Sequence, residues 1–266
     1  MTTSFGSTAW AARTHGRPSG GERWLELARG LRALTGARLH HLGRRLGLAR
    51  GARWAAHDAA LALREVELPR TPLALAALAR LDHAPPWLVA HSLRSYLWGA
   101  LLAVRDGTAF DHELAFTAAA LHDLGLTCVG PEPCFAHRGA ELARATCLAA
   151  GASARRAAEV ADAICQHLNV SPTGTAEAKL VRAGAGYDVV GDRFFDLPRA
   201  LRREVLTRSP RDGFAEHLQA ALAAEAGRQP QTRIAFLCSA MRFPALIARA
   251  DRWFARELAA PAGALP

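Results

Sequence analysis

The amino-acid sequence predicts an all-α fold, and three observations support this prediction. Helix start and stop signals recur regularly from residue 65 onward. No segment of four or more residues alternates apolar and polar side chains as a half-buried strand does. Hydrophobic residues make up 50% of the 266-residue chain and charged residues 21%, which is enough apolar material for a buried core. These observations argue against a sheet-based fold and against a largely disordered chain.

The first part of the chain gives weak helix signals. Residues 1–22 are rich in Gly, Ser and Thr and show no periodicity, so we expect them to be disordered. From Trp24 to Leu63, leucines recur at helical spacing, but several glycines interrupt them. Each internal glycine costs about 1 kcal/mol relative to alanine. The sequence therefore predicts only short, weak helices here.

Charge and composition divide the chain into three parts. Most of the formal net charge of +9 lies in residues 1–64, where arginines greatly outnumber acidic residues. We interpret 1–64 as a basic Gly/Ala/Arg-rich extension, 65–256 as the folded domain, and 257–266 as a disordered tail. The longest apolar stretches, such as 97–104, are too short to cross a bilayer. With no apolar segment of signal-peptide type at its start, the chain is expected to be cytoplasmic.

Helix boundaries beyond residue 65 follow from caps and breakers. Thr71 followed by Pro72 is an N-cap and first-turn pair that opens a helix through about Leu81. A long helix begins at Pro86 and runs to about Arg105, before an Asp-Gly stop. Further helices are predicted at 111–125, 135–150, 153–168, 176–190, 198–208, 213–226 and 243–256.

Two histidines and an aspartate lie on two of these successive helices. His91 lies midway along the first, and His122 with Asp123 lies near the end of the second. Helices joined by a short loop pack antiparallel, and the spacings place the three residues at about the same level. They can then converge on one metal ion. Asp188, on a helix whose glycines permit close packing, is expected to supply a fourth ligand.

A simpler interpretation is that these residues are ordinary core or surface side chains, because most histidines in helices are. A His-Asp dipeptide alone carries little information, since His57 and Asp58 form a second copy. That copy has no preceding apolar helix with a buried histidine, so we interpret it as a surface dipeptide. The copy at His122 and Asp123 is enclosed by apolar residues. Burial of this carboxylate is costly unless a metal or a partner neutralises it.

Together these residues resemble the HD superfamily of helical metal-dependent enzymes, whose pattern is His, then His-Asp, then a distant Asp. Several segments are also similar to its cyanamide hydratase-like branch, and the resemblance covers about 65–255. It implies that His91, His122, Asp123 and Asp188 bind one metal. The segments that carry it are ELPRTPL at 67–73, PPWLVAHSLR at 85–94, DHEL at 111–114, LHDLGLT at 121–127, GYDVVG at 186–191 and SPRDGF at 209–214.

The resemblance implies a reaction and a cofactor. Metal-bound hydroxide would attack a small substrate, most simply the carbon of a nitrile-like compound. Asp123 and His167 would be the catalytic residues, with His167 relaying a proton. Mixed His and Asp ligation suits a divalent metal, with Zn²⁺ favoured and Fe²⁺ and Mn²⁺ left open. The expected partner is therefore a small-molecule substrate, and a homo-oligomer is left open.

The same resemblance singles out further positions. Many phosphate-cleaving HD enzymes have a lysine where Leu126 stands, and the hydratase branch has a threonine where Thr127 stands. His137 and His167 occupy the region in which two-metal relatives bind a second ion. Thr127, His137 and His167 are thus candidates for contact with a second metal or the substrate. Arg211 resembles a family position that pairs with a carboxylate.

Three alternatives remain open from the sequence. An HD phosphohydrolase acting on a nucleotide or phosphate ester would use the same ligands, with Arg94, Arg138, Lys179 or Arg182 replacing the absent lysine. A dinuclear iron oxygenase would need both extra histidines as ligands. A regulator without activity, which we do not expect, would bind nucleic acid through the basic extension. A membrane partner is not expected.

The cysteines exclude two other classes of protein. Five cysteines without a CxxC pair argue against a disulfide scaffold and against a thiolate zinc ribbon.

Overall fold

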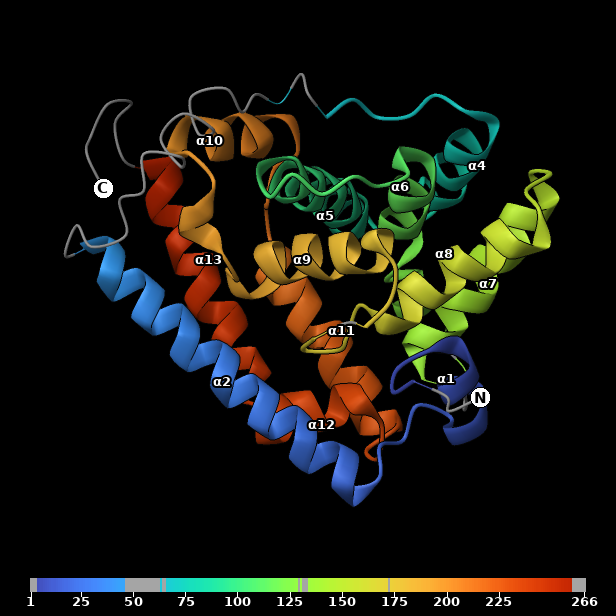
Figure 1. The fold of residues 1–266 in the computed structure, drawn as a ribbon, viewed down its shortest axis with the longest axis horizontal. Helices are drawn as coiled ribbons and strands as arrows, with labels where there is room; N and C mark the ends of the chain where they lie inside the picture. Colours follow the sequence, from blue (N-terminus) through green and yellow to red (C-terminus); the bar gives the residue numbers. More distant parts are fainter. Residues whose placement is uncertain are drawn as a thin grey trace.

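The computed structural model describes residues 4–45, 63, 66–128, 130, 134–171 and 173–259, with the backbone alone for 37–45. This part of the chain contains helices and no strand, which confirms the all-α prediction (Figure 1). None of its helices is both long enough and apolar enough to span a bilayer. The α-helices are α1 (Thr8–Thr14), α2 (Gly20–Arg45), α4 (Pro72–Leu81), α5 (Pro86–Arg105), α6 (His112–Leu121), α7 (Phe135–Ala149), α8 (Ala154–Gln166), α9 (Ala176–Val190), α10 (Arg199–Arg208), α11 (Phe214–Arg228), α12 (Arg233–Ala240) and α13 (Phe243–Ala259).

Local start and stop signals predicted most of these boundaries. The side chains of Thr71, Asp111 and Ser153 accept hydrogen bonds from backbone N–H groups in the first turns of α4, α6 and α8. Helix α9 has the predicted bounds and ends at Gly191, whose φ of +68° is the left-handed conformation that glycine adopts readily. These caps satisfy backbone groups that the helix itself leaves unpaired.

Two elements differ from the prediction for tertiary reasons. Helix α6 was expected to reach Gly125, but it ends at Leu121 and a 3₁₀ turn follows over Leu124–Leu126. This turn packs against the start of α7 so closely that a Cβ on Gly125 would lie 1.9 Å from the carbonyl oxygen of Phe135. Helix α12 was not predicted, and no side-chain hydrogen bond caps its start.

Helices α5 and α9 pack along one another near the middle of the molecule (Figure 1). Two glycines allow this approach. A Cβ on Gly184 would lie 1.8 Å from the carbonyl oxygen of Ser95, and a Cβ on Gly99 would lie 2.5 Å from that of Leu180. The predicted role of the α9 glycines in close packing is confirmed at Gly184. The two helices therefore approach backbone to backbone, which brings side chains of α9 against those of α5.

The prediction of disorder over residues 1–22 is wrong for the described part of this segment. Ser7 caps α1, and Thr8 N–H donates a hydrogen bond to the Asp162 carboxylate of α8. Trp10 is only 1% exposed and belongs to the same hydrophobic core as the helices around α5. Its indole N–H donates to Glu22 over 2.8 Å. Composition gave the wrong prediction here. The segment lacks periodicity, but a buried tryptophan and polar contacts with distant parts of the chain hold it in a defined structure.

Helix α2 is also continuous where short helices were expected. It crosses the region of α12 and α13 on one side of the molecule (Figure 1). Glu26 is buried and accepts a hydrogen bond from Val170 N–H. Gly30 lies against Met241, whose methyl carbon would be 2.0 Å from an added Cβ. Tertiary contacts therefore offset the cost of the glycines. Part of the proposed extension, including His57 and Asp58, lies outside the described residues, as does the tail beyond Ala259.

We expect the Trp10→Ala variant to lower the free energy of unfolding by ~3–5 kcal/mol, as truncation of a fully buried large aromatic side chain does. The matched control is Trp24→Ala, because Trp24 on α2 is 75% exposed and its loss should change stability by only ~0.5 kcal/mol or less. Urea unfolding followed by circular dichroism measures both. Equal stability of the two variants would show that the N-terminal helices do not contribute to the core.

Candidate metal centre

Three elements place a buried His-His-Asp group at one point. His91 lies in the second turn of α5 and has no exposed surface. His122 directly follows α6, and Asp123 begins the 3₁₀ turn with a φ of −106°. The early end of α6 turns both side chains toward α5. His91, His122 and Asp123 offer ligand atoms that all lie within 4.8 Å of one another, so the predicted convergence of the three residues is confirmed.

The distances within this group are short and uniform. Nε2 of His91 lies 3.2 Å from Nε2 of His122. Each of these nitrogens lies 3.4 Å from Oδ2 of Asp123. His167, which follows α8, adds its Nε2 at 3.3 Å from Oδ1 of Asp123. Two imidazoles and one carboxylate thus surround a common point, and a third imidazole lies at its edge.

The hydrogen bonds on the far side of each ring fix which nitrogen faces this point. Nδ1 of His122 donates to the carbonyl oxygen of Ala119 over 2.8 Å, and Nδ1 of His167 donates to that of Ile164 over 2.5 Å. A carbonyl oxygen can only accept, so the neutral ring carries its hydrogen on Nδ1 and presents an unprotonated Nε2. Nδ1 of His91 likewise donates to Asp188 over 2.8 Å. All three rings therefore direct a lone pair toward the Asp123 carboxylate.

This arrangement fits a divalent cation. In the neutral rings, the Nε2 lone pairs of His91 and His122 face each other across 3.2 Å, which is repulsive unless a positive charge lies between them. Oδ1 of Asp123 is buried and accepts no hydrogen bond from the described residues, because the nitrogen nearest to it, Nε2 of the neutral His167 ring at 3.3 Å, carries no hydrogen. Buried polar atoms are ordinarily paired. Imidazole nitrogens with one carboxylate are a donor set suited to Zn²⁺, Fe²⁺ or Mn²⁺, and outer hydrogen bonds on each ring are typical of metal ligands.

The pKa values of the group follow from its burial and its charges. Burial lowers the pKa of His122 to about 4. The charge of Asp123 acts to raise this pKa, and the imidazoles of His91 and His167 act to lower it. His122 is therefore neutral near pH 7 and able to ligate. Burial alone would raise the pKa of Asp123, but the three imidazoles hold it well below its usual range. Burial also opposes the charge on His91, yet the carboxylates of Asp123 and Asp188 raise its pKa.

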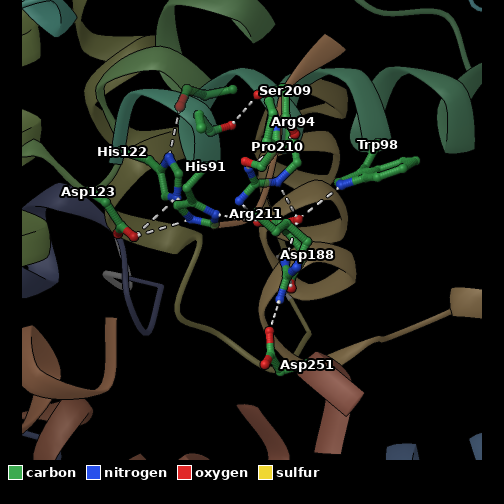
Figure 2. A network of polar contacts seen from close by, with 12 residues as sticks. His91, Arg94, Trp98, His122, Asp123, Asp188, Ser209, Pro210, Arg211 and Asp251 are labelled. Atoms are coloured by element: carbon green, nitrogen blue, oxygen red, sulfur yellow. Dashed lines mark hydrogen bonds and ion pairs between the residues drawn. The ribbon is translucent and has the colours of Figure 1, made fainter. Parts of the chain in front are cut away.

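The structure differs from the prediction that Asp188 is a fourth ligand. Asp188 lies on the opposite side of the His91 ring from Asp123 (Figure 2). Its Oδ1 accepts hydrogen bonds from Arg94, Arg211 and Trp98 at 2.9, 2.8 and 3.1 Å. Its Oδ2 accepts from Arg94 at 2.9 Å and from His91. Both oxygens are thus engaged by donors, and the carboxylate orients His91 instead of facing the ligand nitrogens.

Two buried arginines keep the carboxyl group of Asp188 ionised. Burial would raise the pKa of this carboxyl group, but Arg94 and Arg211 hold it well below its usual range. Arg94 also donates to the carbonyl oxygens of Ser209 and Pro210. Arg211 extends the network to Asp251 at 3.5 Å. The predicted pairing of Arg211 with a carboxylate is confirmed, and that carboxylate is Asp188.

The remaining candidates separate into those at the site and those away from it. His167 lines the same cavity as the His-His-Asp group. Thr127 is exposed and donates its hydroxyl to the carbonyl oxygen of Leu124, so it closes the 3₁₀ turn. His137 does not line the cavity, and burial lowers its pKa, with Glu141 acting weakly in the opposite direction. The structure therefore places Thr127 and His137 outside the group.

A cavity of about 180 Å³ leads away from the His-His-Asp group. Its walls come from α9, α11, α12 and α13, and also from α2, through Gly30, Ala33 and Leu34. Sequence reasoning missed this contribution of α2, because the basic extension was separated from the domain. The only available signal was the helical spacing of leucines, which says nothing about where the helix packs.

The cations proposed as substitutes for a phosphate-binding lysine are engaged elsewhere or lie away from the group. Arg94 is held by Asp188, and Arg138 donates to buried Glu225 at 2.9 Å. Lys179 is exposed and does not line the cavity. Arg182 does line it, and its guanidinium donates to the Asn169 carbonyl at 2.8 Å and to Asp192 at 3.3 Å.

Comparison with known proteins agrees with this geometry. Residues 88–206 match the family model of the HD domain. No curated protein matches the chain. The matched segment contains His91, His122, Asp123, His167 and Asp188, whereas the α2 wall of the cavity lies outside it. Residues 88–206 are therefore similar to the HD domain, whose members are generally metal-dependent hydrolases, and the His-His-Asp group fits the metal binding of that family.

Proposed function

We propose that the protein is a metal-dependent enzyme that adds water to the electrophilic carbon of a nitrile-like substrate, as its resemblance to the cyanamide hydratase-like branch implies. The convergence of His91, His122 and Asp123 at the end of a largely apolar cavity carries this proposal. A bound divalent metal supplies Lewis acidity and lowers the pKa of water at such a site.

The chain's own residues divide the remaining work. His91, His122 and Asp123 hold the metal, while Asp188 and the Ala119 carbonyl fix the ring orientations. His167 is the candidate proton carrier, because its Nε2 reaches Asp123 Oδ1 and its Nδ1 is fixed by a backbone carbonyl. A nitrile-like carbon that accepts water needs a proton on nitrogen, and an imidazole at the edge of the group is placed to deliver it.

Hydrolysis of a phosphate ester is the second candidate function, and the family match favours it. Phosphoryl transfer relies on cations that stabilise charge on the transferred group. Arg94, Arg138 and Arg182 already donate to carboxylates. Because these arginines are already paired, they are not free to stabilise the charge of a phosphate. Their pairing therefore supports an uncharged substrate over a phosphate ester.

Elemental analysis and a substrate panel test the proposed function. We expect purified protein to contain one divalent metal per chain and to convert small nitriles to amides, detected by mass spectrometry. The panel includes nucleotides and phosphate monoesters under the same conditions. Phosphate release without amide formation would replace the proposal by the second candidate, and protein that binds no divalent metal would overturn both.

We expect the His167→Gln variant to keep its metal while its kcat falls by ~10²–10⁴-fold, the usual contribution of a positioned acid or base. The reason is that His167 contacts the Asp123 carboxylate from the edge of the group without completing it. Metal content and kcat are measured on the same preparation. Loss of metal in this variant would instead make His167 a ligand.

A further inference from the structure

The cavity beside the His-His-Asp group is larger than a small nitrile requires. Its volume is about 180 Å³. An engineered apolar cavity of about 150 Å³ stays dry and takes up benzene. Apart from the His-His-Asp group and a few polar residues, the lining is aliphatic and aromatic and includes Leu34, Phe135, Val189, Leu218, Met241 and Trp253. Such a lining favours a hydrocarbon over ordered water.

Helix α2 forms one wall of this cavity and is fixed in place by specific contacts. Glu26, one turn before the wall, is 4% exposed and binds the backbone of Val170. Arg23 donates to the carbonyl oxygen of Gln231 at 3.4 Å. Gly30 admits the Met241 side chain against the helix axis. Leu34, one turn beyond Gly30, therefore stands at a defined position in the cavity wall.

The polar side chains at the other walls do not require a charged ligand. Arg182 and Asp192 line the cavity and pair with each other at 3.3 Å. Gly186 leaves the space for this guanidinium, because an added Cβ would lie 2.2 Å from its Nη1. A second arginine of the lining, Arg249, lies with its guanidinium carbon 5.0 Å from the centroid of the Trp253 ring. The cavity thus combines a reactive polar end with an apolar body and two arginines that neighbouring side chains engage.

We propose that this cavity is a binding site for an uncharged apolar group of about six to eight carbon atoms, carried by the substrate, and that Leu34 limits the length of that group. The proposal rests on the proposed function for the position of the reacting end. It extends that function by making the substrate an apolar organic compound and by making α2 part of the substrate site.

Binding of straight-chain alcohols tests the apolar site without relying on turnover. Isothermal titration calorimetry with the full-length protein as purified would compare 1-propanol, 1-butanol, 1-hexanol, 1-octanol and 1-decanol. We expect the dissociation constant to fall by about fourfold for each added methylene group, up to six to eight carbons, and then to stop falling. The hydroxyl group is common to all members, so any contact it makes with the polar end cancels in this comparison.

Two substitutions on α2 test the role of Leu34. Leu34→Trp should weaken 1-octanol binding by at least about tenfold, because the indole occupies part of the volume that a buried hydrocarbon fills. Leu34→Ala should extend the gain in affinity to 1-decanol. The matched control is Leu31→Trp, since Leu31 lies on the same helix, is 64% exposed and does not line the cavity. It should bind the alcohols as the unchanged protein does.

The outcomes separate this proposal from the proposed function. Affinity that does not depend on chain length, or equal effects of Leu34→Trp and Leu31→Trp, would overturn the apolar site even if the protein contains metal and hydrates nitriles. Length-dependent binding with the expected variant effects, in protein that lacks metal or turnover, would retain the site and reject the function.

Discussion

We expect the His122→Ala variant to lose its bound metal and its activity together. The Nε2 of His122 lies 3.2 Å from that of His91 and 3.4 Å from Asp123 Oδ2, so its removal opens one side of the three-residue group. Changing even an outer partner of a ligand lowers metal affinity by ~10–100-fold. Loss of a direct ligand should exceed that. Metal per chain and kcat/KM, measured on the same preparation, check this expectation.

The control for this variant removes an imidazole that has no part in the group. His83 lies on the exposed connection after α4, so His83→Ala should keep full metal content and activity. Circular dichroism should show that both variants retain their helices, because the effect is attributed to the ligand and not to unfolding. A His122→Ala protein with the metal content of the His83→Ala protein would refute the His-His-Asp centre.

A large loss of stability is expected from Asp188→Ala. Asp188 has no exposed surface, and it neutralises Arg94 and Arg211, both of which are buried. Its removal leaves Arg94 in the interior without its carboxylate partner and leaves Arg211 with only Asp251, at 3.5 Å. Breaking a buried ion pair by removing one partner typically costs ~3–5 kcal/mol. Chemical denaturation should therefore show a large loss, whereas Asp82→Ala at an exposed position should remain near the unchanged protein.

Asp188→Asn distinguishes an orienting role from a direct metal ligand. Asparagine preserves the shape and still accepts the Nδ1–H hydrogen bond of His91, although it gives up the negative charge. If Asp188 acts through His91, the variant should keep one metal per chain, with an affinity lowered by ~10–100-fold. Metal loss as complete as that of His122→Ala would instead restore Asp188 as a ligand. Metal titration monitored by competition with a chelator measures the difference.

The sequence alone located the centre of the site. The spacing of His91 and His122 along two apolar helices placed them at one level of a hairpin, and the structure brings their Nε2 atoms within 3.2 Å. Spacing did not reveal which face of His91 meets which carboxylate. The sequence correctly placed Asp188 near His91, but only the packed structure shows that Arg94 and Arg211 donate hydrogen bonds to its carboxylate.

Helix boundaries were determined locally, whereas the extent of the folded unit was not. Caps such as Thr71 and Ser153 act within one turn, so the sequence contains the whole signal for them. The order of α1 and α2 depends on contacts far away in the chain, such as Thr8 with Asp162 and Gly30 with Met241. Tertiary packing of this kind outweighs weak propensity. The sequence thus determined the all-α class and the His-His-Asp group, and only the tertiary structure decided that α2 forms part of the cavity.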